Sequence, residues 1–150
     1  MKDIKLAIGR TLANAHGQID FADQQLEKLR YKRISSRVCI TVLSAELTQI
    51  RIKMRSAIGK AHSKLAIRAN ALRKELRTFE TFLRNYKELR GEHIVKQDKY
   101  RKTMLETYES CAALGIDADE CVALEDADMK NRRSQLHDMI GNLRNIAAVK

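Results

Sequence analysis

Residues 58–89 read IGKAHSKLAIRANALRKELRTFETFLRNYKEL, and this stretch decides the fold. An apolar or aromatic residue recurs there at every seventh position, at Ile58, Leu65, Leu72, Phe79 and Tyr86. Further apolar residues flank this repeat, at Ala69, Leu76, Phe82, Leu83 and Leu89. A seven-residue repeat lines up side chains along one side of a helix, and the flanking positions widen the stripe beyond a strict two-stranded seam. The stretch therefore predicts a long helix that packs against at least one other helix.

A second seven-residue repeat lies near the C-terminus. Its members are Val122, Met129, Leu136 and Leu143, accompanied by Ile140 and Ala147. Asp117 and Glu120 are spaced like a capping box, which predicts the start of this helix. Gly115 suits the left-handed residue that follows the end of the preceding helix. Two helices that carry such repeats on opposite sides of a turn are typical of an antiparallel bundle.

The N-terminal segment carries a single apolar stripe. Its members are three or four residues apart, at Ile4, Ile8, Leu12, Ala15, Ile19, Ala22, Leu26 and Leu29. This spacing predicts a helix over 1–34. Gly17 allows two interpretations, a break before a new helix capped by Asp20 or the close approach of a neighbouring helix. Cations before Ser35–Ser36 and the capping tendency of serine predict a helix boundary at that pair.

Residues 38–54 are apolar on nearly all sides, and here a strand competes with a helix. Residues 38–43 are rich in β-branched side chains, and residues 50–54 alternate with a period of two. Both features would suit a β-hairpin. Helical spacing across the whole segment favours a helix, which we predict, with the hairpin as the alternative.

The composition agrees with an all-α fold. The 150 residues include no proline and only 6 glycines, so the turns of sandwiches and barrels lack their usual residues. We predict one elongated, antiparallel helical bundle or coiled coil of three to five helices, forming a single domain over 1–150. Its expected parts are a helix over 1–34, heptad-patterned central helices over 36–90, a helix over 92–114 after a hinge at Gly91, and a C-terminal helix over 117–148.

Signatures of catalysis, metal binding and cofactor binding are missing, so we expect no enzyme, no cofactor and no metal site. The sequence has no glycine-rich phosphate loop, no Gly-x-Ser-x-Gly, no His-Glu-x-x-His and no Cys-x-x-Cys. The three cysteines are Cys39, Cys111 and Cys121. An odd number of cysteines without a secretory signal predicts a reducing, cytoplasmic location, and no apolar run is long enough for a membrane span. Cys111 and Cys121 are expected to be small core residues, with a redox pair as the alternative.

The charge is strongly positive and unevenly distributed. The net charge is +10 overall; residues 1–110 hold 24 Lys+Arg and 12 Asp+Glu, and residues 111–150 hold 5 and 7. One candidate polyanion-binding cluster is free of acids and contains Lys28, Arg30, Tyr31, Lys32, Arg33 and Arg37. A second candidate set is Arg73, Arg77 and Arg84. Arginines beside a ring that can stack suit nucleic acid, and a plain solvated surface is the alternative.

The function expected from these features is that of a non-enzymatic assembly or adaptor protein, which acts through coiled-coil self-association, most simply as a homodimer, or through contact with another protein. The residues expected at the helix-packing or oligomer interface are Ile58, Leu65, Leu72, Leu76, Phe79, Leu83, Tyr86, Val122, Met129, Leu136 and Leu143. The alternative function is a basic helical nucleic-acid-binding protein that contacts phosphates with little sequence specificity.

Overall fold

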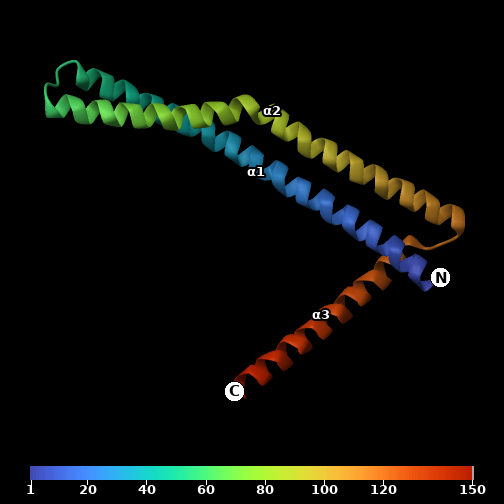
Figure 1. Cartoon of the computed structure of the whole chain (residues 1–150). Coiled ribbons are helices and arrows are strands. Elements are labelled where there is room, and N and C mark those ends of the chain that lie inside the picture. The colour runs from blue at the N-terminus through green and yellow to red at the C-terminus, as the bar shows by residue number, and fades with distance from the viewer. Residues whose placement is uncertain (150) are drawn as a thin grey trace. The chain divides into compact units, whose positions relative to one another are not determined.

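The chain folds into three α-helices, as the computed structural model shows for residues 1–149 (Figure 1). In chain order they are α1 (Lys2–Met54), α2 (Lys60–Leu114) and α3 (Ala118–Ala148). No strand occurs in the described part of the chain. The all-α prediction is confirmed, and so is the preference for a helix over 38–54, because α1 runs through that segment without interruption.

The chain divides into two compact units. One unit is Ala22–Val95, which we call the hairpin unit, and the other combines Met1–Phe21 with Lys96–Lys150, which we call the terminal unit. Each unit has its own buried cluster of apolar side chains. The expectation that all 150 residues form one domain stays a prediction.

The hairpin unit is two antiparallel helical segments joined by a turn over 55–59. The antiparallel direction follows from pairs such as Arg68 Nη2 and Glu46 Oε1, 2.9 Å apart, and Lys32, whose Nζ lies 4.4 Å from the centre of the Phe82 ring. Gly59 has a φ of +66°, a left-handed conformation that glycine adopts without steric cost. The buried core of this unit lies between the two segments and consists of Leu47, Ile50, Ala69, Leu72 and Leu76.

The predicted helix boundary at Ser35–Ser36 is wrong. α1 continues through both serines. The Ser35 hydroxyl donates a hydrogen bond to the Lys32 carbonyl oxygen at 3.1 Å, a back-bond that lets serine remain inside a helix. Ser36 is completely buried, and its hydroxyl finds no hydrogen-bond partner. Tertiary packing therefore outweighs the local capping tendency of this pair.

Two further predicted boundaries differ from the structure. The hinge at Gly91 is wrong, because α2 continues through that residue and ends at Leu114. The predicted central helices over 36–90 are interrupted instead at the turn over 55–59, which contains Ile58. Cations in the last turn of α1, at Arg51 and Lys53, were the available sequence signal for this end.

The terminal unit confirms the predicted turn between α2 and α3. Gly115 has a φ of +65°, and the Ile116 amide donates to the Cys111 carbonyl at 2.9 Å, which are features of a Schellman motif. Asp117 is the N-cap of α3, since its side chain accepts a hydrogen bond from the Asp119 amide at 2.9 Å. Leu12, Cys111 and Ala118 form the buried cluster of this unit.

α3 approaches α1 closely at Gly9. A Cβ at this position would collide with the carbonyl oxygen of Cys121 and would lie 2.9 Å from the Glu125 Cβ. Gly17 has no atom within 4 Å of the same hypothetical Cβ, and α1 continues through it. Both interpretations of Gly17 are therefore wrong, and the close helix approach occurs at Gly9.

Replacement of these two glycines by alanine should have opposite effects on stability. Gly9→Ala inserts a methyl group against backbone that cannot move aside without displacing α3, so we expect a loss of about 1–3 kcal/mol in the free energy of unfolding. Gly17→Ala should raise it by up to about 1 kcal/mol, because alanine favours a helix interior and meets open space. Urea unfolding followed by circular dichroism measures both changes, and a similar gain in both variants would contradict the close approach.

Candidate interaction surfaces

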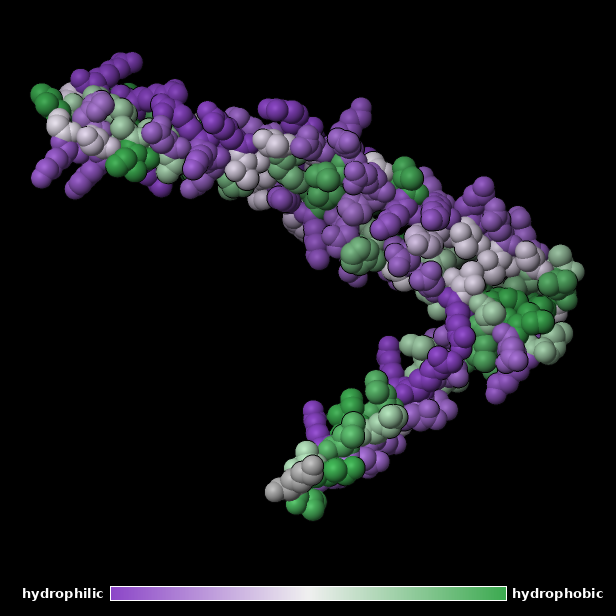
Figure 2. All heavy atoms as spheres, viewed as in Figure 1, coloured by the Kyte–Doolittle hydropathy of each residue, from purple (hydrophilic) through white to green (hydrophobic). Residues whose placement is uncertain are grey.

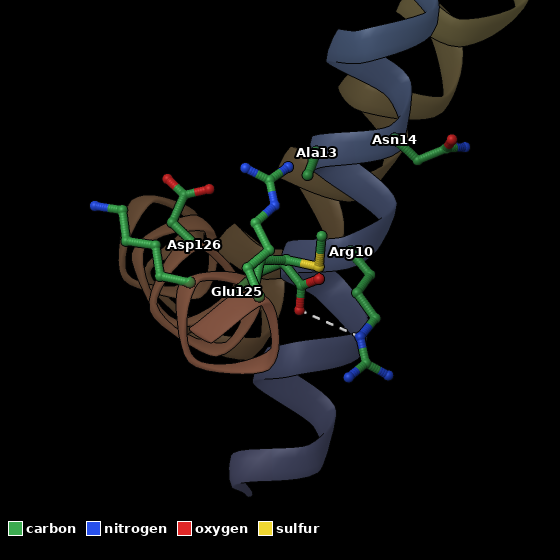
Figure 3. Close-up of a pocket in the computed structure, with 8 residues that line it drawn as sticks. Arg10, Ala13, Asn14, Glu125 and Asp126 are labelled. Carbon is green, nitrogen blue, oxygen red and sulfur yellow. Dashed lines mark hydrogen bonds and ion pairs between the residues drawn. The ribbon is translucent and has the colours of Figure 1, made fainter. Parts of the chain in front are cut away.

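The first three turns of α3 are docked on α1 of the terminal unit. Ala118, Cys121 and Glu125 are the buried residues of α3. Glu125 Oε2 lies 3.2 Å from Nε of Arg10, and Figure 3 shows the two side chains pointing toward each other. Lys5 and Glu120 add an ion pair at 3.0 Å. Glu120 therefore pairs with α1, which holds the start of α3 in place through charge as well as close packing.

A pocket of about 560 Å³ opens beside this contact (Figure 3). The residues that line it are Arg10, Ala13, Asn14, Glu125, Asp126, Met129, Lys130 and Arg133. Acids and bases occur together in this lining. The Arg10 guanidinium already forms ion pairs with Glu125 and, at 3.5 Å, with Asp128. The pocket therefore offers no concentrated charge for a ligand.

The remainder of α3 carries an exposed apolar stripe. From Met129 to Val149 every residue is exposed except the half-buried Gly141. After Met129, the large apolar side chains of α3 are Leu136, Met139, Ile140, Leu143 and Ile146. At 3.6 residues per turn these five lie within an arc of ~120°. Figure 2 shows hydrophobic atoms gathered along this end of the helix. We call these five residues the α3 stripe.

The residues predicted at helix-packing or oligomer interfaces fall into three groups. Leu72 and Leu76 are buried in the hairpin seam, and the half-buried members are Leu65, Phe79, Leu83, Tyr86 and Val122. Met129, Leu136 and Leu143 are exposed on α3. Ile58 is 88% exposed and lies in the turn over 55–59, so its assignment to the helical repeat is wrong and the repeat begins at Leu65.

The predicted basic cluster lies on α1 within the hairpin unit, and part of it is engaged in packing. Lys32 lies over the Phe82 ring, and the Arg33 guanidinium carbon is 4.7 Å from the centre of the Tyr86 ring. These cation–π contacts fix two of the cations against α2. The exposed members that no such contact occupies are Lys28, Arg30, Tyr31 and Arg37.

A small pocket connects this cluster to α2. It has a volume of about 330 Å³ and is lined by Leu26, Glu27, Arg30, Tyr86 and Arg90. The structure thus brings Arg90 beside the predicted cluster, a residue that the sequence reasoning missed because it lies about 60 positions away on the other helix. Of the second predicted set, Arg77 and Arg84 are exposed on α2, and Arg73 Nη1 donates to Asn70 Oδ1 at 2.8 Å.

The net charge of the protein resides entirely in the hairpin unit. Residues 22–95 hold 17 Lys+Arg and 7 Asp+Glu, a net charge of +10. Residues 1–21 and 96–150 together hold 12 of each, a net charge of zero. The boundary between basic and neutral parts therefore follows the two units, whereas the sequence alone suggested a boundary near residue 110.

A second basic region, also missed in the sequence reasoning, surrounds the turn of the hairpin unit. Residues 51–68, which we call the hairpin tip, hold six Lys+Arg and no Asp or Glu. The whole stretch over 47–74 is free of acids. This absence was visible in the sequence, but only the antiparallel pairing brings the cations of the two helices to one end.

The cysteines are free thiols in different surroundings. Cys111 and Cys121 are buried in the terminal unit, and Cys39 is half-buried. Burial raises the pKa of the Cys121 thiol, and the nearby Cys111 adds to this effect. A thiol with a raised pKa forms little of the reactive thiolate at neutral pH. Cys121 therefore has the surroundings of a core residue.

The thiols should differ in their reaction with Ellman's reagent. At pH 8 we expect the folded protein to release about one equivalent rapidly, from Cys39, while Cys111 and Cys121 react only in denaturant. The pKa of the Cys121 thiol in the folded protein lies above its ordinary value. Raising the pH toward that pKa should therefore increase the fraction of thiolate and speed the reaction of Cys121. A Cys39→Ser variant should lose the rapid phase; rapid release of three equivalents by the native protein would contradict the burial of the other two.

The part of the chain from Met1 to Val149 contains no group of three or more His, Cys, Asp or Glu side chains placed to hold a metal ion. None of its helices has a stretch long and apolar enough to cross a bilayer. No protein-family model, curated protein or solved structure matches the chain.

Proposed function

We propose that this protein is a non-enzymatic assembly protein that self-associates through the α3 stripe. The observation that carries the proposal is the exposure of Leu136, Leu143 and their neighbours on α3. From residue 129 to 149 no side chain of this helix is buried within the unit, and Gly141 is the one half-buried residue. An isolated helix of about 20 residues is marginal in water unless an apolar face is covered. A partner that covers the stripe would stabilise this part of α3 and remove its apolar surface from water.

A second copy of the chain is the partner that the charges favour. On one side of the stripe lie Gln135 and Asn142, which are uncharged and would not repel an identical helix, and on the other side lie Arg133 and Arg144. The terminal unit as a whole carries no net charge, although residues 129–149 hold four Lys+Arg and one Asp, whereas two hairpin units of +10 repel each other more strongly. Contact between copies is therefore least opposed through the terminal unit, and a coiled coil or bundle of α3 helices is the arrangement that a seven-residue repeat favours.

Two charge substitutions within the stripe should dissociate the assembly. We expect the wild-type protein to have a mass above the 17.2 kDa of the monomer in size-exclusion chromatography with light scattering. Leu136→Glu/Leu143→Glu should be monomeric at the same concentration, because burial of unpaired carboxylates at a helix interface is unfavourable.

The matched control is Ser134→Glu/Asn145→Glu. These residues are exposed on the opposite side of α3, and the control changes the net charge by the same amount. It should keep the wild-type mass. A wild-type protein that is monomeric at every concentration tested, or a control that dissociates as completely as the stripe variant, would contradict the proposal.

The confinement of the +10 charge to the hairpin unit favours a second candidate function, the binding of nucleic acid through phosphates. The residues available for this role are the exposed cations Lys28, Arg30 and Arg37, because Lys32 and Arg33 pack on aromatic rings. Contacts of this kind have a steep salt dependence and little preference for base sequence.

Binding to a random-sequence duplex, measured by fluorescence anisotropy over a salt series, tests the second function. Lys28→Glu/Arg30→Glu/Arg37→Glu should weaken binding and reduce the slope of log K against log salt by about 3. Lys2→Glu/Lys96→Glu/Lys99→Glu, which removes the same charge outside the cluster, should leave most of the slope unchanged. Absence of binding at low salt, or equal losses in both variants, would exclude a site at this cluster.

A further inference from the structure

We propose that the hairpin tip docks on the surface of an anionic lipid bilayer, with Ile58 reaching the boundary between headgroups and acyl chains and the surrounding cations binding lipid headgroups. This site lies in the hairpin unit and uses none of the α3 stripe. It is therefore independent of the proposed self-association.

The first argument is the density of unpaired positive charge. The six cations of the tip are Arg51, Lys53, Arg55, Lys60, Lys64 and Arg68. All six are exposed. Among residues 1–149, Arg68 is the one tip cation in an ion pair, with Glu46. Clusters of four to eight Lys and Arg side chains are the composition that binds anionic headgroups, with a contribution from each cation near the surface.

The N-terminus of α2 increases the positive potential on one side of the tip, whereas the C-terminus of α1 carries the opposite partial charge beside Arg51 and Lys53. The first turn of α2 contains no acidic residue. It begins with Lys60, and Lys64 follows in the next turn of the helix. A helix N-terminus carries partial positive charge, which an acidic residue usually balances. Here the lysines add to that charge and no acidic residue of the first turn balances it, which favours an external anion on this side of the tip.

The second argument is the apolar apex. Ile58 is 88% exposed in the turn, and Ile67, which is 70% exposed, and Ile52 are further exposed isoleucines of the tip. At this end of the hairpin unit, Figure 2 shows hydrophobic atoms among hydrophilic ones. Exposed apolar side chains surrounded by cations are typical of surfaces that insert shallowly into a headgroup region.

The same residues favour lipid over nucleic acid. No Phe, Tyr or Trp occurs between Tyr31 and Phe79, so His62 is the one aromatic ring that the tip offers for stacking on a base. Three exposed isoleucines have no role in a purely phosphate-based contact, but they gain free energy on entering an apolar phase. Since none of the described helices is able to span a bilayer, the contact is interfacial.

Co-sedimentation of the full-length protein with vesicles tests the proposal. The two vesicle types are pure phosphatidylcholine and a mixture containing about 30% phosphatidylserine. We expect binding to the anionic vesicles alone. Arg55→Glu/Lys60→Glu should reduce the partition coefficient at least about tenfold, since two headgroup contacts become repulsive. Lys96→Glu/Lys99→Glu, which makes the same charge change at exposed sites elsewhere on α2, should reduce it less than about threefold.

The apolar apex is tested separately by Ile58→Ser, which should lower the partition coefficient by about tenfold. Val95→Ser, at a residue 70% exposed in the same unit, should not change it. Circular dichroism checks that every variant is folded. Of the three substituted tip residues, Arg55 and Ile58 lie in the turn outside the helices, and Lys60 is the first residue of α2.

The proposal is overturned if the wild type does not bind anionic vesicles at low salt, if both charge variants lose binding equally, or if Ile58→Ser binds like the wild type. A parallel measurement with duplex DNA tests nucleic acid as the alternative partner. DNA binding that depends on Arg55 and Lys60, without vesicle binding, would make the tip a nucleic-acid site. These outcomes do not depend on the mass measured by light scattering, so failure here leaves self-association standing.

Discussion

Two helices in contact bury only the stripe along which their side chains meet, and this limit determines which apolar residues of the chain remain available to partners. In the hairpin unit the seam fully buries Leu72 and leaves Ile67 exposed, although both belong to the same apolar segment. In the terminal unit α3 contacts α1 at Gly9 and forms ion pairs with Lys5 and Arg10. The α3 residues that make these contacts all precede residue 129. The apolar side chains that follow have no covering helix in that unit.

Net charge is confined to one of the two units, whereas exposed apolar side chains occur in both. The terminal unit is electrically neutral and presents the α3 stripe, while the hairpin unit carries the entire +10 and presents cations around its tip. Apolar association is non-directional and is opposed by like charge, so it is strongest where the charge is balanced. Long-range attraction of anionic partners instead needs a concentration of one sign.

The local features predicted correctly are those whose partners lie within a few residues. Asp117 caps α3 with amides two and three positions ahead, and Gly115 closes α2 with a hydrogen bond from Ile116 to Cys111. Ser36 and Gly91 failed as boundary signals because serine and glycine are compatible with both a helix end and a helix interior. At Ser36 burial against the other helix decided the outcome, even with an unsatisfied hydroxyl. The turn over 55–59 was missed because its apolar Ile58 continued the seven-residue spacing.

The sequence by itself determined that this protein is helical and that α3 begins at its Asp117 cap, because periodicity and capping act through neighbours three or four residues apart. It also determined that the hairpin tip is free of acids. Only the tertiary structure decided which members of the repeats are buried, that Gly9 rather than Gly17 admits a crossing helix, and that Arg90 joins the cluster on α1. These outcomes depend on which faces meet across long separations in sequence, and an apolar stripe looks the same in one dimension whether a neighbouring helix covers it or leaves it open.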